Sequence, residues 1–197
     1  GPLTNMSDVV SRLPHLRHKI EQLVIMGGAV DLGNWTPAAE FNIWVDPHAA
    51  DVVFRTAAVP APDRGDEALI PLTMIGLEVT HKAWLTDDHA DLLRGTGRAG
   101  RFVAELLDHF VGFHQRRFGW EGGPIHDAVT IAHLIDPTLV TTLPMNVQIE
   151  TESPLCLGRT VADRWSVTGL APNVAVGLDI DRNRFVTMLL DHLSALP

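Results

Sequence analysis

The chain has 197 residues, of which 46% are hydrophobic and 20% are charged, and its formal net charge at pH 7 is −9. This composition is too apolar for an intrinsically disordered chain, and it is sufficient to form the core of a single domain. No apolar run approaches the roughly 18–20 residues that a helix needs to cross a bilayer. The excess of acidic over basic residues argues against a protein that binds the nucleic-acid backbone.

The chain contains one cysteine, Cys156, so it cannot form an internal disulfide. Its start, Gly1-Pro2-Leu3, also lacks the basic and apolar stretch of a secretory leader, and together these features predict a reducing, cytoplasmic setting. Cys156 lies in the apolar stretch 154–157, which favours a buried structural thiol over a nucleophile.

Helical and strand-like patterns alternate along the chain. A first helix begins at Asn5 or Ser7 and runs to about Gln22, and Pro14 is expected to bend or split it. The other expected helices cover residues 46–56, a segment capped by Thr86, and residues 98–117, 127–135 and 183–196, and the expected strands cover residues 23–26, 68–75, 139–150 and 160–168. This alternation predicts an α/β fold with a central, mostly parallel sheet flanked by helices. Ligands of such sheets bind beyond the carboxyl ends of the strands, here in the loops after Met26 and Ile75.

The loop after the strand at residues 23–26 is rich in glycine and in polar side chains. The glycines at 27–28 allow a ligand to approach the backbone closely, and Asn34, Glu40 and Asn42 supply amide and carboxylate groups. If this segment is extended, Glu40 and Asn42 point the same way. These groups suit a polyhydroxylated ligand, because a sugar hydroxyl both donates and accepts hydrogen bonds. The alternative is an ordinary turn with a solvated glutamate.

Segments spread along the chain match one family in the same order. They are Gly1-Pro2-Leu3-Thr4-Asn5, Met26-Gly27-Gly28, Gly33-Asn34, Thr36-Pro37, Ala39-Glu40-Phe41-Asn42, Asp46-Pro47-His48-Ala49-Ala50, Gly76-Leu77-Glu78-Val79-Thr80, Pro124-Ile125-His126-Asp127 and Gly158-Arg159-Thr160-Val161 with Asp163. The chain therefore resembles the inosine–uridine-preferring nucleoside hydrolases over nearly its whole length. The resemblance implies an α/β fold and hydrolysis of the N-glycosidic bond of ribonucleosides in purine and pyrimidine salvage. Relatives of this kind are commonly homodimers or homotetramers.

The resemblance also implies which residues bind the nucleoside. Asn34 would bind ribose hydroxyls, Glu40 and Asn42 would hold the ribose, chiefly on its 5′ side, and Met26 would pack beside the sugar. His126 would be catalytic, since its counterpart in purine-accepting members can protonate the leaving base.

The family further implies a calcium ion that holds the ribose 2′- and 3′-hydroxyls and the attacking water. Asp127 and the main-chain carbonyl of Thr4 would be ligands of this ion. Calcium takes six to eight oxygen ligands and leaves room for water and diols, so it suits this task.

A second family signature, Asp-x-Asp-x-Gly-x-Asp-Asp, does not occur in the 197 residues, although the family draws most calcium carboxylates and the general base from it. Asp87-Asp88 lacks the glycine spacing, and Asp179-Ile180-Asp181 lies near the far end. Residues 1–5 match a family segment that normally follows several strands. We therefore expect residues 1–197 to form a single nucleoside hydrolase domain that is incomplete at its N-terminus and represents the C-terminal two-thirds of the fold. We expect this chain to be inactive by itself.

Two other functions stay open at this point. One is a non-catalytic ribose-binding or interaction remnant of the family, and the other is an enzyme acting on another N-ribosyl compound, such as a nicotinamide nucleoside. A zinc site is disfavoured, because the chain has no His-Glu-x-x-His motif.

The roles of several aromatic residues have more than one interpretation. The resemblance implies that the loop Arg116–Gly123 is a mobile flap from which Phe118 or Trp120 would stack on the base, although an ordinary surface loop explains these residues equally well. His81 is expected to be structural, near the pocket. The four tryptophans Trp35, Trp44, Trp84 and Trp165 are expected in the core or in an interface.

Overall fold

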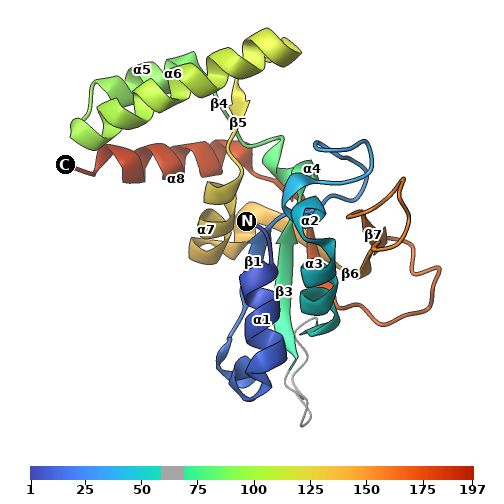
Figure 1. Ribbon diagram of the computed structural model, residues 1–197. Helices are drawn as coiled ribbons and strands as arrows, with labels where there is room; N and C mark the ends of the chain where they lie inside the picture. Colours follow the sequence, from blue (N-terminus) through green and yellow to red (C-terminus); the bar gives the residue numbers. More distant parts are fainter. Residues whose placement is uncertain (59–68) are drawn as a thin grey trace. The chain divides into compact units, whose positions relative to one another are not determined.

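The structure is a computed structural model that describes residues 1–58 and 69–197 (Figure 1). These residues form two compact units, each of which is described by itself. The sheet unit comprises Gly1–Glu78 and Thr141–Leu178, and the helical unit comprises Val79–Val140 and Asp179–Pro197.

The sheet unit is built on parallel strands with helices packed against them. Its elements are α1 (Thr4–Arg12), η1 (Pro14–Lys19), β1 (Leu23–Met26), α2 (Phe41–Val45), α3 (Pro47–Arg55), β2 (Ala57–Ala58), β3 (Ile70–Ile75), β6 (Val140–Ile149), β7 (Thr160–Asp163) and β8 (Val174–Ile180). The strand order is β1-β3-β8-β6-β7, and β2 pairs with β3. The pairs β1–β3, β2–β3 and β3–β8 are parallel, whereas β6–β7 is antiparallel. The expected α/β fold with a mostly parallel sheet is therefore confirmed.

The core of the sheet unit lies between the strands and α1, α2 and α3. β3 is apolar on both faces, as expected of a buried parallel strand, and pairs with β1 from Leu23↔Leu72 to Met26↔Ile75. The buried residues that share this core include Val10 of α1, Ile43 of α2, Val53 and Phe54 of α3, Leu72 and Met74 of β3, Val147 of β6 and Val176 of β8. The register places the ends of β1 and β3 side by side, so the loops that follow them start at one edge of the sheet.

The helical unit consists mainly of helices, and the longest of them are the two that cover Arg98–Phe118 and Arg182–Ser194. Its elements are β4 (Trp84–Leu85), α5 (Asp87–Arg94), α6 (Arg98–Phe118), β5 (Gly123–Pro124), α7 (Asp127–Ile135), η2 (Pro137–Leu139) and α8 (Arg182–Ser194), and α4 (Leu77–Thr80) leads into it. α5 and α6 pack side by side, and α8 packs against both (Figure 1). α6 ends at Gly119, whose left-handed backbone (φ 70°) lets its N–H reach the Gln115 carbonyl at 2.9 Å.

Most expected elements are confirmed, with informative differences at their ends. The chain breaks at Pro14 into α1 and η1, as expected. The strand expected over 160–168 ends at Asp163, because the Asp163 carboxylate accepts hydrogen bonds from the N–H groups of Val167 and Thr168 and turns the chain. The expected strand at 68–75 begins at Ile70, and Ala68 lies outside the described residues. The helices α2 and α4 and the strand β8 were not expected.

Three side chains are less buried than a core position requires. Trp35 and Trp165 are 56% and 81% exposed, so neither belongs to the core, and the alternative for them, a position in an interface, stays a prediction. Cys156 is half-buried rather than buried.

Within the described part of the chain, no helix is both long enough and apolar enough to cross a membrane.

The packing of β3 makes a direct prediction about stability. Leu72 is 1% exposed, so Leu72→Ala should lower the free energy of unfolding by about 2–5 kcal/mol, from lost burial and a residual cavity. Leu155→Ala is the matched control, because Leu155 is 84% exposed and its truncation should change stability by less than about 0.5 kcal/mol. Urea unfolding followed by circular dichroism measures both. Equal losses in the two variants would contradict this description of the core.

Candidate functional site

The loop after β1 is fastened to the start of α2 by the carboxylate of Glu40. Glu40 is the N-cap of α2, and its Oε1 accepts the N–H of Asn42 at 2.9 Å. Its Oε2 accepts the N–H of Gly28 at 2.9 Å and that of Ile43 at 3.3 Å. The segment that follows Glu40 is therefore helical, so the condition under which Glu40 and Asn42 would point the same way, an extended segment, is not met. Glu40 and Asn42 nevertheless lie next to each other, because the cap brings the carboxylate back over the first turn.

Asn42 and Met26 are in direct contact, as a common ligand site requires. The Nδ2 of Asn42 lies 3.2 Å from the main-chain oxygen of Met26 and 3.2 Å from its sulfur. The Oδ1 of the exposed Asn34 accepts the N–H of Phe41 at 3.0 Å, which holds Asn34 against the start of α2. Among residues 1–58 and 69–197, the Asn42 oxygen has no donor and the Asn34 amide nitrogen has no acceptor, so with respect to these residues each can bond a ligand. The structure thus brings together Met26, Asn34, Glu40 and Asn42.

The electrostatics of Glu40 combine two opposing effects. Its side chain is 3% exposed, and this burial raises the pKa of the Glu40 carboxyl above its ordinary value of 4.5. The hydrogen bonds from the N–H groups of Asn42, Gly28 and Ile43 act in the opposite direction, since they favour the charged form. Because these donors already use most of its acceptor capacity, Glu40 has room for about one further hydrogen bond, such as one from a ligand hydroxyl.

Two further side chains, Glu78 and Thr160, hold the same loop. The Oε1 of Glu78 accepts the N–H groups of Val30 and Asp31, both at 2.9 Å. The Thr160 hydroxyl accepts the N–H of Ala29 at 2.9 Å and donates to the carbonyl of that residue. Residues 28–31 are therefore held by side chains from three other parts of the sequence. The sequence alone did not indicate these roles of Glu78 and Thr160, and the only signal for the two residues was that both lie in family-like segments.

The backbone of this loop requires glycine at residue 28. Gly28 has a left-handed conformation (φ 73°), and a Cβ there would lie 2.8 Å from the Cγ2 of Thr160. Its carbonyl accepts the N–H of Leu77 at 3.1 Å, which ties the loop after β1 to the segment after β3. This conformation and close packing explain why glycine occurs at residue 28.

In the helical unit, His126 sits at the start of α7 in contact with Thr80. The Nδ1 of His126 lies 2.8 Å from the Thr80 hydroxyl, and the His81 ring lies 5.9 Å from the His126 ring. Burial, followed by the nearby His81, lowers the pKa of His126 from 6.5 to about 4, although Asp127 acts in the opposite direction. His126 is therefore neutral at pH 7 and acts there as a hydrogen-bonding group rather than as a cation.

Trp120 is packed among aromatic side chains of the same unit. Its ring stacks with those of Phe118 at 4.8 Å, Trp84 at 5.2 Å and His114 at 5.6 Å, and it meets His81 edge-on at 5.6 Å. Much of the Trp120 surface is thus already in aromatic contact. This packing supports a structural role for Trp120, whereas Phe118, which is exposed, has free ring surface for a ligand.

The calcium ligands implied by the resemblance, Thr4 and Asp127, belong to different units. Thr4 is the first residue of α1, and its hydroxyl donates to the Asp46 carboxylate at 2.5 Å. Asp127 is the exposed first residue of α7, and its main-chain oxygen accepts from the Thr130 hydroxyl at 2.7 Å. Among residues 1–58 and 69–197, no group of three or more His, Cys, Asp or Glu side chains could hold a metal ion. Within the described chain, these donors do not by themselves meet the six to eight oxygens that calcium requires.

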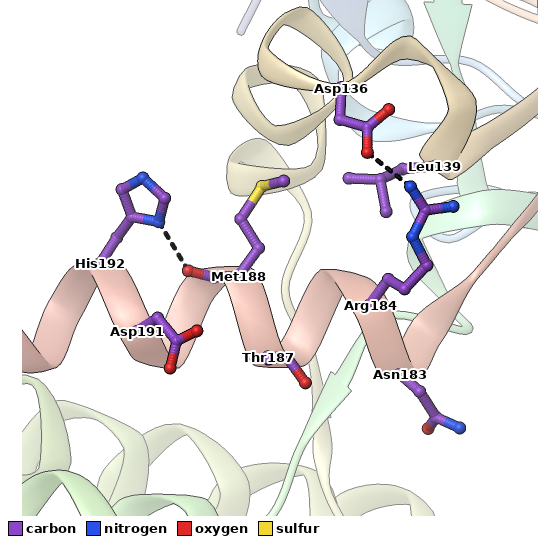
Figure 2. Close-up of a pocket in the computed structure, with 8 residues that line it drawn as sticks. All are labelled: Asp136, Leu139, Asn183, Arg184, Thr187, Met188, Asp191 and His192. Atoms are coloured by element: carbon purple, nitrogen blue, oxygen red, sulfur yellow. Dashed lines mark hydrogen bonds and ion pairs between the residues drawn. The ribbon is translucent and has the colours of Figure 1, made fainter.

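A hollow of about 500 Å³ lies along α8, but none of the predicted site residues lines it (Figure 2). Three of its polar side chains already have partners within the protein. The Arg184 guanidinium binds the Asp136 carboxylate at 2.5 Å, and the Nδ1 of His192 lies 2.7 Å from the Met188 carbonyl (Figure 2). We therefore assign the candidate ligand site to the loop after β1 rather than to this hollow.

The role of Glu78 can be tested at the two amides that it holds. Glu78→Leu removes the acceptor, so the Val30 and Asp31 amides should exchange hydrogen faster by on the order of 10- to 100-fold, which corresponds to about 1–3 kcal/mol. Glu78→Gln keeps a side-chain oxygen and should exchange nearly as slowly as the unmodified protein. Hydrogen exchange followed by NMR measures both amides. Unchanged exchange in Glu78→Leu would show that Glu78 does not hold this loop.

The carboxyl of Glu40 should titrate above pH 4.5. The titration is followed by NMR through the ¹³C resonance of this carboxyl, and that resonance is assigned by its absence from the spectrum of Glu40→Gln. The native state then binds this proton more tightly than the unfolded state. The protonated Glu40 therefore contributes fully to the free energy of unfolding below pH 4.5, and this contribution is lost as the pH rises through the pKa of the native state. Glu150 is an internal control, since hydrogen bonds from the N–H groups of Ser153 and Glu152 lower its pKa. A Glu40 midpoint at or below that of Glu150 would refute the assigned burial effect.

Comparison with known proteins gives one consistent result. The family profile described as inosine-uridine preferring nucleoside hydrolase matches residues 1–187. The pyrimidine-specific ribonucleoside hydrolase RihA of Citrobacter koseri is 44% identical over 196 residues, which is 98% of this chain and 59% of the relative. The RihA of a Shewanella species is 45% identical over 98% of this chain and 58% of the relative. The chain thus spans less than two thirds of the length of these relatives.

The fold agrees with this result. The structure of the purine-preferring ribonucleoside hydrolase from Gardnerella vaginalis matches with a TM-score of 0.84 and 33% sequence identity, over 98% of this chain and 58% of that chain. The sequence match and the structural match therefore cover almost all of the same residues. The chain belongs to the inosine-uridine preferring nucleoside hydrolase family.

Proposed function

We propose that this chain carries the ribose-binding and leaving-group residues of a ribonucleoside N-ribohydrolase, which converts a ribonucleoside and water into ribose and a free base. The observation that carries the proposal is the cluster of Met26, Asn34, Glu40 and Asn42 in the loop at the carboxyl end of β1. Ligands of parallel α/β sheets bind in this position. The family match over residues 1–187 supports the reaction.

Each residue of the cluster has a separate task in the proposal. The Asn42 oxygen accepts and the Asn34 amide donates hydrogen bonds to ribose hydroxyls, because the opposite end of each side chain is already bonded within the protein. Glu40 accepts one more hydroxyl while it fixes the loop, and the Met26 side chain packs beside the sugar. Fixed hydrogen bonds of this kind can stabilise the oxocarbenium-like charge that develops as the glycosidic bond breaks.

His126 serves the leaving base in this proposal. It is neutral at pH 7, so it assists the base through a ring N–H hydrogen bond as the electron pair of the C1′–N bond moves onto the base.

The relatives named pyrimidine-specific are 44–45% identical, whereas the purine-preferring one is 33% identical, and this difference supports a preference for pyrimidine nucleosides. The single cysteine supports action in a reducing compartment.

The general base and most metal carboxylates are proposed to come from residues outside the 197. The Asp-x-Asp-x-Gly-x-Asp-Asp motif does not occur in the sequence, and Asp127 supplies one carboxylate. In the proposal, Asp127 and the Thr4 carbonyl complete a calcium shell made mainly of those other carboxylates. We therefore expect the 197-residue chain alone to release no ribose at enzymatic rates.

The proposal is tested by measuring ribose release from uridine, cytidine and inosine, together with the intact mass of the protein isolated from its natural source. We expect a mass above the 21.5 kDa of this chain, and hydrolysis that is faster with the pyrimidine nucleosides. The purified 197-residue chain should be inactive. Hydrolysis by that chain at enzymatic rates would refute the need for other carboxylates, and an inactive natural protein would favour a non-catalytic ribose-binding role.

Substitution of Asn42 tests the assigned site within an active protein. Asn42→Ala should lower kcat/KM for uridine by on the order of 10- to 100-fold, as expected for loss of about 1–3 kcal/mol of hydrogen bonding. Asn183→Ala is the matched control, because Asn183 is exposed on α8 and lines the hollow there. A larger loss in Asn183→Ala than in Asn42→Ala would move the site to that hollow.

A further inference from the structure

Thr80 is the side chain that bonds the ring of His126. It is the last residue of α4, its side chain is fully buried (0% exposed), and its hydroxyl lies 2.8 Å from the Nδ1 of His126, 46 positions away in the sequence. Both residues belong to the helical unit. The contact leaves the second ring nitrogen, Nε2, as the one available to a ligand.

The direction of this hydrogen bond follows from the burial of Thr80. A hydroxyl can donate one hydrogen bond, and a buried donor without an acceptor costs on the order of 1–3 kcal/mol. Among the described residues, the His126 ring is the hydrogen-bond partner of the Thr80 hydroxyl. The favoured arrangement therefore has the Thr80 O–H donating to Nδ1, because the reverse arrangement would leave the buried hydroxyl proton without an acceptor.

The surrounding rings keep His126 in this orientation. The His81 ring meets the His126 ring at 60° with their centres 5.9 Å apart, and His81 is in turn packed edge-on against Trp120. A neutral imidazole carries one proton, so a ring that accepts at Nδ1 carries its proton at Nε2.

We propose that Thr80 is a positioning residue that holds His126 in the tautomer with its proton on Nε2, so that this N–H points to the leaving base. The proposal deepens the proposed function and rests on it for the identity of the base. As the electron pair of the C1′–N bond passes to the base, the Nε2–H group donates a hydrogen bond to the base atom that gains charge. The other tautomer would present a lone pair at that place and would repel the developing charge.

The tautomer can be read without any enzymatic activity. Long-range ¹H–¹⁵N NMR spectra at a single pH near 7.5 distinguish the protonated from the unprotonated ring nitrogen, and His126→Gln assigns the signals. We expect a protonated Nε2 in the unmodified protein and in Thr80→Ser, which keeps the hydroxyl. Thr80→Val has a similar shape but no hydroxyl, and it should show loss of that single tautomer. A proton on Nδ1 in the unmodified protein would overturn the proposal.

Kinetics in the natural enzyme provide the second measurement. Uracil needs a hydrogen bond as it leaves, whereas p-nitrophenolate is a stable anion that needs little assistance. Thr80→Val should therefore lower kcat for uridine at least 10-fold more than kcat for p-nitrophenyl riboside, and Thr80→Ser should restore most of the loss. The exposed Thr187→Val is the matched control and should change neither rate.

Each outcome decides between the two proposals. Equal losses on both substrates in Thr80→Val would show that Thr80 is merely structural and would overturn the positioning role. If the natural protein hydrolyses neither substrate, the proposed function fails, and the NMR spectra still decide whether Thr80 sets the tautomer of His126.

Discussion

The arrangement of the candidate ribose-binding residues depends on one buried carboxylate, that of Glu40. A carboxylate removed from water is costly unless hydrogen bonds replace its hydration, and here the N–H groups of Gly28, Asn42 and Ile43 do so. These bonds fix the end of β1 to the start of α2. As a result, the side chains of Asn34 and Asn42 are each bonded at one end and have no partner at the other end within the described part of the chain, which is the state that hydrogen bonding to a sugar requires.

The sequence predicted the sheet well where local patterns have one structural interpretation. The apolar run of β1 ends at paired glycines, and the apolar run of β3 is buried on both faces, so both were recognisable as parallel strands. The helix α2 was missed because Phe41–Val45 is too short to show periodicity, and its N-cap is a glutamate rather than one of the usual small polar residues. β8 was missed because Gly177 and Asp179 interrupt its apolar pattern.

The site was predictable only in part. Composition suggested a polyhydroxylated ligand near Asn34, Glu40 and Asn42, and the family resemblance supplied the ribose. The supporting residues could not be predicted from spacing, because Thr160 is 131 positions from Ala29 and Thr80 is 46 positions from His126. Such pairs meet only through the tertiary fold, so their roles require coordinates. The same holds for Trp120, for which the family resemblance implied a base-stacking flap or an ordinary loop, and whose ring is packed among other aromatic side chains.

The central claim is that the loop after β1 binds ribose through Asn34 and Asn42, and its most direct test is a titration of the ¹⁵N-labelled natural protein with ribose. The side-chain amide signals of Asn34 and Asn42 and the backbone amide of Gly28 should shift together and saturate, and Asn42→Ala should abolish saturation. Saturable shifts centred on the residues that line the hollow along α8, or no shifts in a folded protein that hydrolyses uridine, would contradict the account.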